Sequence, residues 1–208
     1  MAIPRSLEST VGLAFALLVA LGLSSTPARA GSHTWDVNEV FSDATGQVQF
    51  VELVEANGTP GETGVPGHNM TSNAKVFTIV GPALAPPTSN KFYLIATAAF
   101  AALPGAPTPD AIIPAGVLPF FFSTSGDTVT YVPWDALTFG AVPTDGTTSL
   151  KADLTTGLNS PTNYAGVTGS VDASPAQVPM LSAQGFLVLG LLLAAIGSRV
   201  LVRPRATA

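Results

Sequence analysis

The sequence contains no cysteine and only two histidines among its 208 residues. Without cysteine, the chain can form neither disulfides nor thiolate metal sites, so its stability must come from a packed core. His33 and His68 are far apart in the sequence. The sequence therefore does not predict a zinc site built on histidine or a histidine-dependent catalytic triad.

Basic residues are scarce in the middle of the chain. Residues 31–177 contain no arginine and only three lysines, against 12 acidic residues, so their formal net charge is −9. A surface of this charge repels the phosphate backbone of DNA and RNA. We therefore expect no nucleic-acid partner.

An apolar run near the N-terminus predicts a secretory signal peptide. Residues 11–23 are almost wholly apolar, follow Arg5, and lead to Ala28 and Ala30 in an A-x-A pattern. This order of a basic residue, an apolar run and small residues is typical of a cleaved signal. We expect residues 1–30 to be removed, so that the mature chain begins at Gly31.

A second apolar run lies near the C-terminus. The 21 residues from 178 to 198 carry no charge, and a helix of that length spans about 30 Å, the thickness of a bilayer's hydrocarbon core. Arg199, Arg203 and Arg205 follow directly, and clustered arginine marks the cytoplasmic side. The pattern predicts a membrane-anchoring tail at 178–208 with a single transmembrane helix, which a polar linker at 172–177 joins to the preceding domain.

The segment between these two runs has the pattern of an all-β protein. Short apolar stretches rich in Val, Phe, Tyr, Thr and Ile alternate with Gly, Pro and Asp turns, which favours an antiparallel β-sandwich over residues 31–171. Long connections rich in Gly, Pro and Asn are expected at 56–73 and 104–115, and one helical turn is expected at 98–103. The predicted strands are 35–41, 48–54, 75–80, 92–97, 117–122, 128–132, 136–139 and 148–152.

Motifs in this segment resemble those of the lamin-tail domain family, and they occur in the family's order. Residues 37–41 (VNEVF) and 49–53 (QFVEL) are similar to its opening strands, and 92–97 and 126–131 to its central strands. The closing motifs are similar to 135–140, 145–150 and 159–163. The resemblance implies an immunoglobulin-like sandwich of a kind found in exported bacterial proteins.

The start of the tail resembles the bacterial IPTL-CTERM sorting signals, which pair a proline-containing motif with one membrane span and a basic end. The corresponding residues here are Val178, Pro179, Met180, Leu181 and Ser182. The resemblance implies that a sorting protease recognises this motif.

Carboxylates gather near the first two predicted strands. Asp36, Glu39 and Asp43 are candidate Ca²⁺ ligands, because hard cations require several converging oxygen atoms. No Asp-x-Asp-x-Asp-Gly loop is present, so no metal or other cofactor is predicted as required. Glu39 and Glu52 belong to the motifs of the resemblance, and the alternative is that they accept hydrogen bonds from backbone N–H groups.

An aromatic run offers two alternatives. Residues 119–122 (PFFF), with Tyr131 and Trp134, would form an exposed docking patch if they faced outward, or part of the core if 117–122 were a buried strand.

Catalysis by a pair of carboxylates is a further hypothesis. A glycoside hydrolase needs two carboxylates about 5–10 Å apart, and the sequence singles out no such pair.

The function expected from these patterns is a non-catalytic β-sandwich module at the cell envelope. The predicted location is the cell surface, with the membrane as one partner and a surface polysaccharide or protein as another. The two alternatives are a Ca²⁺-dependent carbohydrate-binding module and a hydrolase or hydrolase accessory domain.

Overall fold

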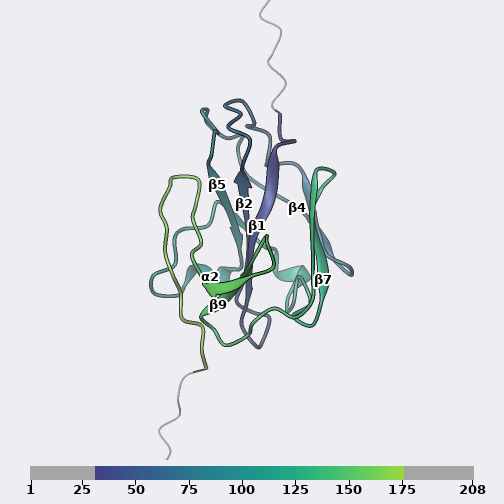
Figure 1. Ribbon diagram of the computed structural model, residues 1–208, viewed down its shortest axis with the longest axis vertical. Coiled ribbons are helices and arrows are strands. Elements are labelled where there is room, and N and C mark those ends of the chain that lie inside the picture. The colour runs from purple at the N-terminus through teal and green to yellow at the C-terminus, as the bar shows by residue number, and fades with distance from the viewer. Residues whose placement is uncertain (1–30, 176–208) are drawn as a thin grey trace, which may run out of the picture. The chain divides into compact units, whose positions relative to one another are not determined.

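The computed structural model describes residues 31–175 of the chain (Figure 1). The predicted signal peptide with Ala28 and Ala30, the sorting motif at 178–182 and the basic end with Arg199, Arg203 and Arg205 lie outside the described residues. Within residues 31–175, no helix is long and apolar enough to cross a membrane.

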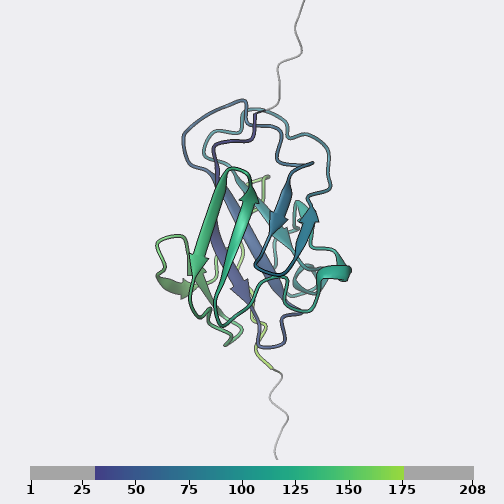
Figure 2. The same cartoon turned by 90° about the vertical axis from the view of Figure 1, so that its right-hand side faces the viewer.

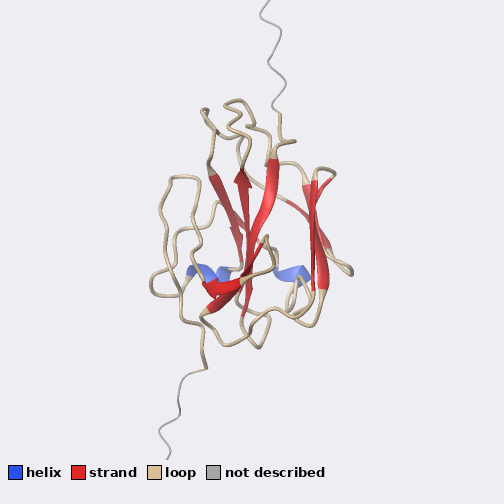
Figure 3. Cartoon of the chain, in the orientation of Figure 1, coloured by secondary structure: helices blue, strands red, loops and turns tan. Residues whose placement is uncertain are grey.

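The described residues form two β-sheets with few helices, as the all-β prediction requires (Figure 3). One sheet has six strands in the order β10-β9-β1-β2-β5-β6, and the other has four in the order β4-β3-β7-β8. The strands are β1 (Trp35–Ser42), β2 (Gln49–Glu55), β3 (Asn69–Thr71), β4 (Val76–Thr78), β5 (Phe92–Ala96), β6 (Ala111–Ile112), β7 (Asp127–Val132), β8 (Asp135–Phe139), β9 (Thr148–Lys151) and β10 (Thr156–Leu158). A four-residue helix, α2 (Ala98–Ala101), follows β5, and a 3-10 turn, η1 (Ala115–Val117), follows β6.

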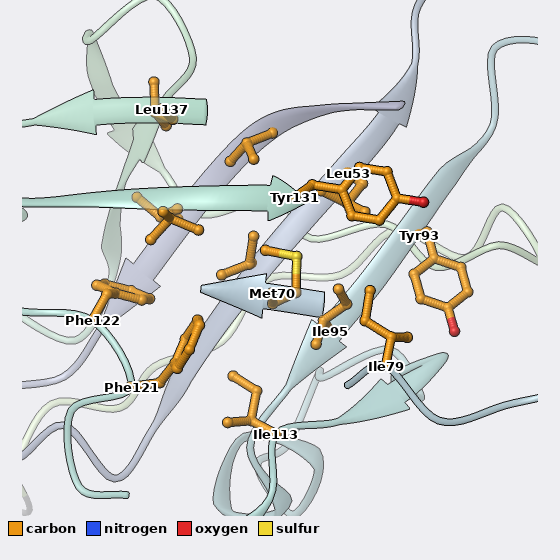
Figure 4. Close-up of a cluster of buried hydrophobic side chains, with 14 of the residues drawn as sticks. Leu53, Met70, Ile79, Tyr93, Ile95, Ile113, Phe121, Phe122, Tyr131 and Leu137 are labelled. Carbon is orange, nitrogen blue, oxygen red and sulfur yellow. The ribbon is translucent and has the colours of Figure 1, made fainter. Parts of the chain in front are cut away.

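The two sheets pack face to face around one core. Figure 2 shows the four-stranded sheet in front of the six-stranded sheet. Side chains from both sheets and from the 113–122 segment meet between them (Figure 4). β7 alternates buried and half-buried residues, which is the pattern of a strand with one face on the core. The fully buried members of this core include Leu53, Met70, Ile95, Phe122 and Tyr131.

The six-stranded sheet is covered on its outer face as well. Phe41, Phe50, Leu94 and Phe100 form a second buried cluster there, and Phe100 comes from α2. Because β2 contributes to both clusters, six of its seven residues are buried, including Gln49, Glu52 and Glu55. Burial on both faces explains why the regular alternation of the sequence gives way along this strand.

A β-bulge interrupts β1. Its pairing with β2 passes from Val37 opposite Leu53 directly to Glu39 opposite Glu52, so Asn38 is the extra residue. Val37 and Val40 both lie in the core between the sheets. The bulge therefore leaves Asn38 and Glu39 together on the outer face, where regular alternation would have placed them on opposite faces.

Seven of the eight predicted strands and the predicted helical turn occur in the structure, but the strand predicted at 117–122 does not. η1 ends at Val117, and Phe120 has a left-handed φ of 57°, a conformation that a regular strand does not contain. The apolar run was therefore misleading, because Phe121 and Phe122 enter the core from an irregular segment.

Two polar side chains hold this irregular segment in place. The Gln49 side chain is fully buried, accepts a hydrogen bond from the Phe121 backbone N–H at 2.7 Å, and donates one to the Phe122 carbonyl at 3.0 Å. The Lys75 ammonium donates to the carbonyls of Val117, Pro119 and Phe120 at 2.6–2.8 Å. These bonds take the place of a strand ladder for backbone groups that would otherwise lack partners.

Three short strands were not predicted. β3 and β6 lie in the segments expected to be long connections, and β10 pairs with β9 at the edge of the larger sheet. β5 and β6 pair in parallel, so the expectation of a wholly antiparallel sandwich was wrong at that edge.

The described chain begins and ends at opposite ends of the sandwich. In Figure 1 its N-terminal end, in purple, lies at the top, and its C-terminal end, in yellow-green, lies at the bottom. Part of the predicted linker belongs to the packed domain, because the Ala173 N–H donates to the Gly146 carbonyl at 2.8 Å and the Ser174 hydroxyl donates to the Asp145 carbonyl at 3.0 Å.

Candidate functional site

A polar pocket lies on the outer face of the six-stranded sheet, beside the bulge in β1. Its volume is about 540 Å³, within the size range of small-molecule sites. Asn38 and Glu39 from β1, Glu52 from β2 and Lys151 from β9 line it. The segment from 159 to 168 completes the pocket through Ser160, Thr162 and Thr168.

Glu39 is paired with a lysine at this pocket. Its side chain is 1% exposed, and one oxygen lies 2.6 Å from the Lys151 ammonium, which keeps 27% of its own side chain exposed. The other oxygen accepts the Ser160 backbone N–H at 3.0 Å. The Ser160 hydroxyl bridges the pair, because it accepts from Lys151 at 2.8 Å and donates to Glu39 at 3.3 Å.

Glu52 lies opposite Glu39 across the β1–β2 ladder and forms no ion pair with another described residue, although the Lys151 charge lowers its pKa slightly. One oxygen accepts the Asn38 side-chain amide at 2.6 Å, and the other accepts the Thr162 backbone N–H at 2.5 Å. Burial raises the pKa of Glu52 to about 7, although these hydrogen bonds oppose the shift, and the Glu39 charge adds to it. Glu52 therefore holds a proton for much of the time at neutral pH.

These contacts match the expectation that Glu39 and Glu52 accept hydrogen bonds from backbone N–H groups. All four carboxylate oxygens already have a donor, and both side chains are 1% exposed. A carboxylate in this state holds the 159–163 segment against the sheet. It is poorly placed to attack, or to donate a proton to, a substrate that arrives from solvent.

The structure does not bring the three candidate Ca²⁺ ligands together. Glu39 is bonded to Lys151, and Asp43 accepts the Thr45 hydroxyl at 2.5 Å and the Val48 N–H at 3.0 Å within its own turn. Asp36 lies near Asp135 and Glu55; burial raises its pKa, and those charges raise it further. Residues 31–175 contain no group of three or more His, Cys, Asp or Glu side chains placed to hold a metal ion.

Glu55 shows the opposite electrostatic outcome to Glu52. Burial favours a higher pKa for it, but donors from Asn90, Thr59 and Thr34 outweigh burial and lower the pKa. The pKa values of the two buried carboxylates therefore shift in opposite directions because Glu55 accepts more hydrogen bonds than Glu52 does.

A second cluster lies at the end of the sandwich where the described residues begin, and we call it the N-terminal pole (residues 31–33, 62, 68 and 134). Trp134 is 46% exposed, and its ring N–H donates to the Ser32 hydroxyl at 3.1 Å. The same hydroxyl lies 2.7 Å from Nε2 of His68. His33 and His68 meet the indole edge-on, with ring centroids 5.9 and 6.2 Å away, so the exposed tryptophan is held in one orientation.

The predicted first residue of the mature chain is part of this pole. The Gly31 carbonyl accepts the Gly64 N–H at 2.9 Å, and a side chain at position 31 would come within 2.5 Å of the Glu62 carboxylate. A larger residue at position 31 would therefore require the Glu62 side chain to move aside.

The predicted aromatic patch does not form. Phe121, Phe122 and Tyr131 are at most 1% exposed and lie in the core, whereas Trp134 is exposed at the N-terminal pole. The alternative that this run belongs to the core therefore holds for Phe121 and Phe122, whereas Phe120 is only half-buried and the segment is not a strand.

Sequence patterns did not single out Lys151, Ser160, Thr162, Ser32 or His68 as site residues. Lys151 meets Glu39 because β9 pairs with β1, and Ser160 and Thr162 follow β10 at that edge. Ser32 reaches Trp134 from the chain before β1, whereas His68 reaches it within the four-stranded sheet, since β3 pairs with β7. The sequence offered one signal: lysine and histidine are scarce between residues 31 and 177, so each of them is a candidate for a specific role.

Comparison of the chain with protein-family models, curated proteins and solved structures found no match.

Proposed function

We propose that this protein is an exported, immunoglobulin-like β-sandwich module of lamin-tail type, tethered at the cell envelope, that binds an extracellular ligand without catalysis. The signal at residues 1–30 and the anchoring tail at 178–208 support export and tethering. The two-sheet domain between them and the order of its motifs support the family assignment.

The tail supplies the attachment. Its apolar run is long enough to span a bilayer with Arg199, Arg203 and Arg205 on the cytoplasmic side. Pro179 would then lie at the outer membrane face, where a sorting protease reaches it. The membrane and that protease are the two partners proposed for the tail.

The exposed Trp134 is the observation that carries the binding role. Tryptophan combines a large apolar face with little side-chain freedom, which makes it a frequent anchor of binding sites. Here its orientation is held by Ser32, His33 and His68 before any ligand arrives. The N-terminal pole is also at the opposite end of the domain from the residues that lead to the tail (Figure 1). We propose that this pole contacts a surface polysaccharide or protein.

Binding of the protein to isolated envelope polysaccharide and to intact cells tests this role. Trp134→Ala should reduce binding at least tenfold when binding is measured well below the melting temperature of the variant, because the buried half of the side chain also contributes to stability. Leu158→Ala is the matched control, because Leu158 is 67% exposed on β10 and lies outside the pole. Equal binding by the two variants would refute the assignment of the pole.

The outer-face pocket is the observation that most favours the hydrolase alternative, because Glu39 and Glu52 converge there. We favour a non-catalytic role because both carboxylates are buried and fully hydrogen-bonded to the protein. The Ca²⁺-dependent alternative has less support, because Asp36, Glu39 and Asp43 each have separate surroundings.

A further inference from the structure

The outer-face pocket holds three chemical groups that can react with one another. Lys151 supplies a primary amine, Asn38 supplies a carboxamide, and Glu52 supplies a buried carboxyl group in contact with that carboxamide. We propose that Lys151 and Asn38 condense into an intramolecular amide that covalently joins β9 to β1. This inference does not depend on the proposed ligand or on the tether.

Strand pairing brings the two side chains to the same place. β9 pairs with β1 so that Lys151 lies opposite Glu39, and the Ala152 N–H donates to the Asn38 carbonyl at 2.8 Å. Asn38 and Lys151 are therefore diagonal neighbours on adjacent strands. In a regular ladder such neighbours face opposite sides, but the bulge in β1 turns Asn38 to the outer face, where Lys151 also lies.

Each partner is held by a carboxylate suited to its role. The Lys151 ammonium lies 2.6 Å from Glu39, which is placed to accept a proton and leave a nucleophilic amine. The amine must then turn from Glu39 to the side-chain carbon of the preceding residue, Asn38. Because the groups belong to one fold, this step is intramolecular and gains from a high effective concentration.

Glu52 is placed to act as the acid. Its contact with the Asn38 carboxamide is 2.6 Å, and the nitrogen and oxygen of such an amide are assigned rather than seen. In the reverse orientation, a protonated Glu52 donates to the carboxamide oxygen and polarises its carbon for attack. The raised pKa of Glu52, caused mainly by burial, keeps that proton available near neutral pH.

The reaction balances without an oxidant or a second substrate. The Lys151 nitrogen forms a bond to the side-chain carbonyl carbon of Asn38, and the bond from that carbon to the amide nitrogen breaks. Glu39 takes one proton from the Lys151 ammonium. Glu52 gives its proton to the departing nitrogen and regains one from the attacking nitrogen as the amide forms. The nitrogen leaves as ammonia, which recovers the proton held by Glu39 and departs as ammonium.

The link would act as a covalent cross-link within the domain. The sequence has no cysteine and cannot form a disulfide. The amide would connect the first strand to a strand near the end of the domain, so it would close most of the sandwich into one covalent loop and restrict the unfolded chain.

Tryptic mapping of the denatured full-length protein tests the proposal. The domain offers trypsin three sites, Lys75, Lys91 and Lys151. With the link in place, trypsin cannot cut at Lys151, and the peptide that ends at Lys75 remains attached to residues 92–199. The mass of this branched product should equal the sum of its two peptides less one ammonia, and it should be the main form.

Three variants separate the roles of the residues. Lys151→Arg keeps the cation beside Glu39 but lacks a primary amine, and Glu52→Gln removes the acid at nearly constant size, so both should give unlinked peptides. Lys91→Arg is the control and should keep the link. The proposal is overturned if the wild-type protein yields mainly unlinked peptides, if Lys151 is joined to Glu39 with loss of water, or if Glu52→Gln forms the link as fully as the wild type.

Discussion

Titration of Glu52 should make the domain less stable as the pH rises toward neutrality. Burial of this side chain raises its pKa from 4.5 to about 7, so between these two values the folded state holds a proton that the unfolded state has released. Stability then falls with increasing pH. At about 1.4 kcal/mol per pKa unit, the full effect is about 3 kcal/mol.

Other carboxylates affect the stability of the domain in a different pH range. The pKa of Asp145 is lowered to about 2 by hydrogen bonds from Thr148 and Thr147, and that of Glu55 is lowered despite its burial. These groups add stability that is lost as the pH falls below about 4. The decline caused by Glu52 should therefore be visible between about pH 5 and about pH 8.

Urea unfolding followed by tryptophan fluorescence measures this decline, because Trp35 is fully buried. The free energy of unfolding should drop by about 3 kcal/mol across that range in the wild type. It should change much less in Glu52→Gln, which cannot ionise. A wild-type profile that is flat or rises over this range would refute the account of Glu52 as a carboxyl group kept neutral by burial.

Two further predictions concern Lys75, which holds the 117–122 segment, and metal binding. Lys75→Met should lower the free energy of unfolding by about 1–3 kcal/mol, because it leaves three backbone carbonyls without their donor. Lys91→Met is the control and should lower it by about 0.5–1 kcal/mol, because the Lys91 ammonium lies 5.6 Å from the Tyr164 ring centre. Equal losses in chemical denaturation would contradict the role given to Lys75. EDTA and added Ca²⁺ should leave the midpoint of thermal unfolding unchanged, whereas a clear rise with Ca²⁺ would revive the Ca²⁺-dependent alternative.

The all-β class and most strand positions could be predicted because they depend on local patterns. β1, β5 and β7 contain β-branched and aromatic residues between turn signals, and such patterns are recorded in the sequence itself. The 117–122 segment has the same composition, but its partners are side chains rather than a neighbouring strand. Gln49 and Lys75 fix it from other parts of the chain, and no local pattern reports that.

The candidate sites were less predictable, because they depend on strand order and on one extra residue. The two motifs at 37–41 and 49–53 marked Glu39 and Glu52, but the pairing of Glu39 with Lys151 follows from β9 lying beside β1. The bulge at Asn38 places Glu39 on the same face of the sheet as Asn38, whereas regular alternation would place the two residues on opposite faces. Likewise, Ser32 and His68 reach Trp134 only through tertiary contacts.

The most direct test of the central claim is the location of the domain in cells that make the full-length chain or a truncation lacking residues 178–208. The account predicts that the full-length domain is retained with the envelope and is digested when protease is added to intact cells or, where an outer membrane encloses the envelope, to spheroplasts. The truncation should be released into the periplasm or medium. Freely soluble full-length protein in a host without sorting enzymes, or a domain protected inside the cytoplasm, would contradict the account.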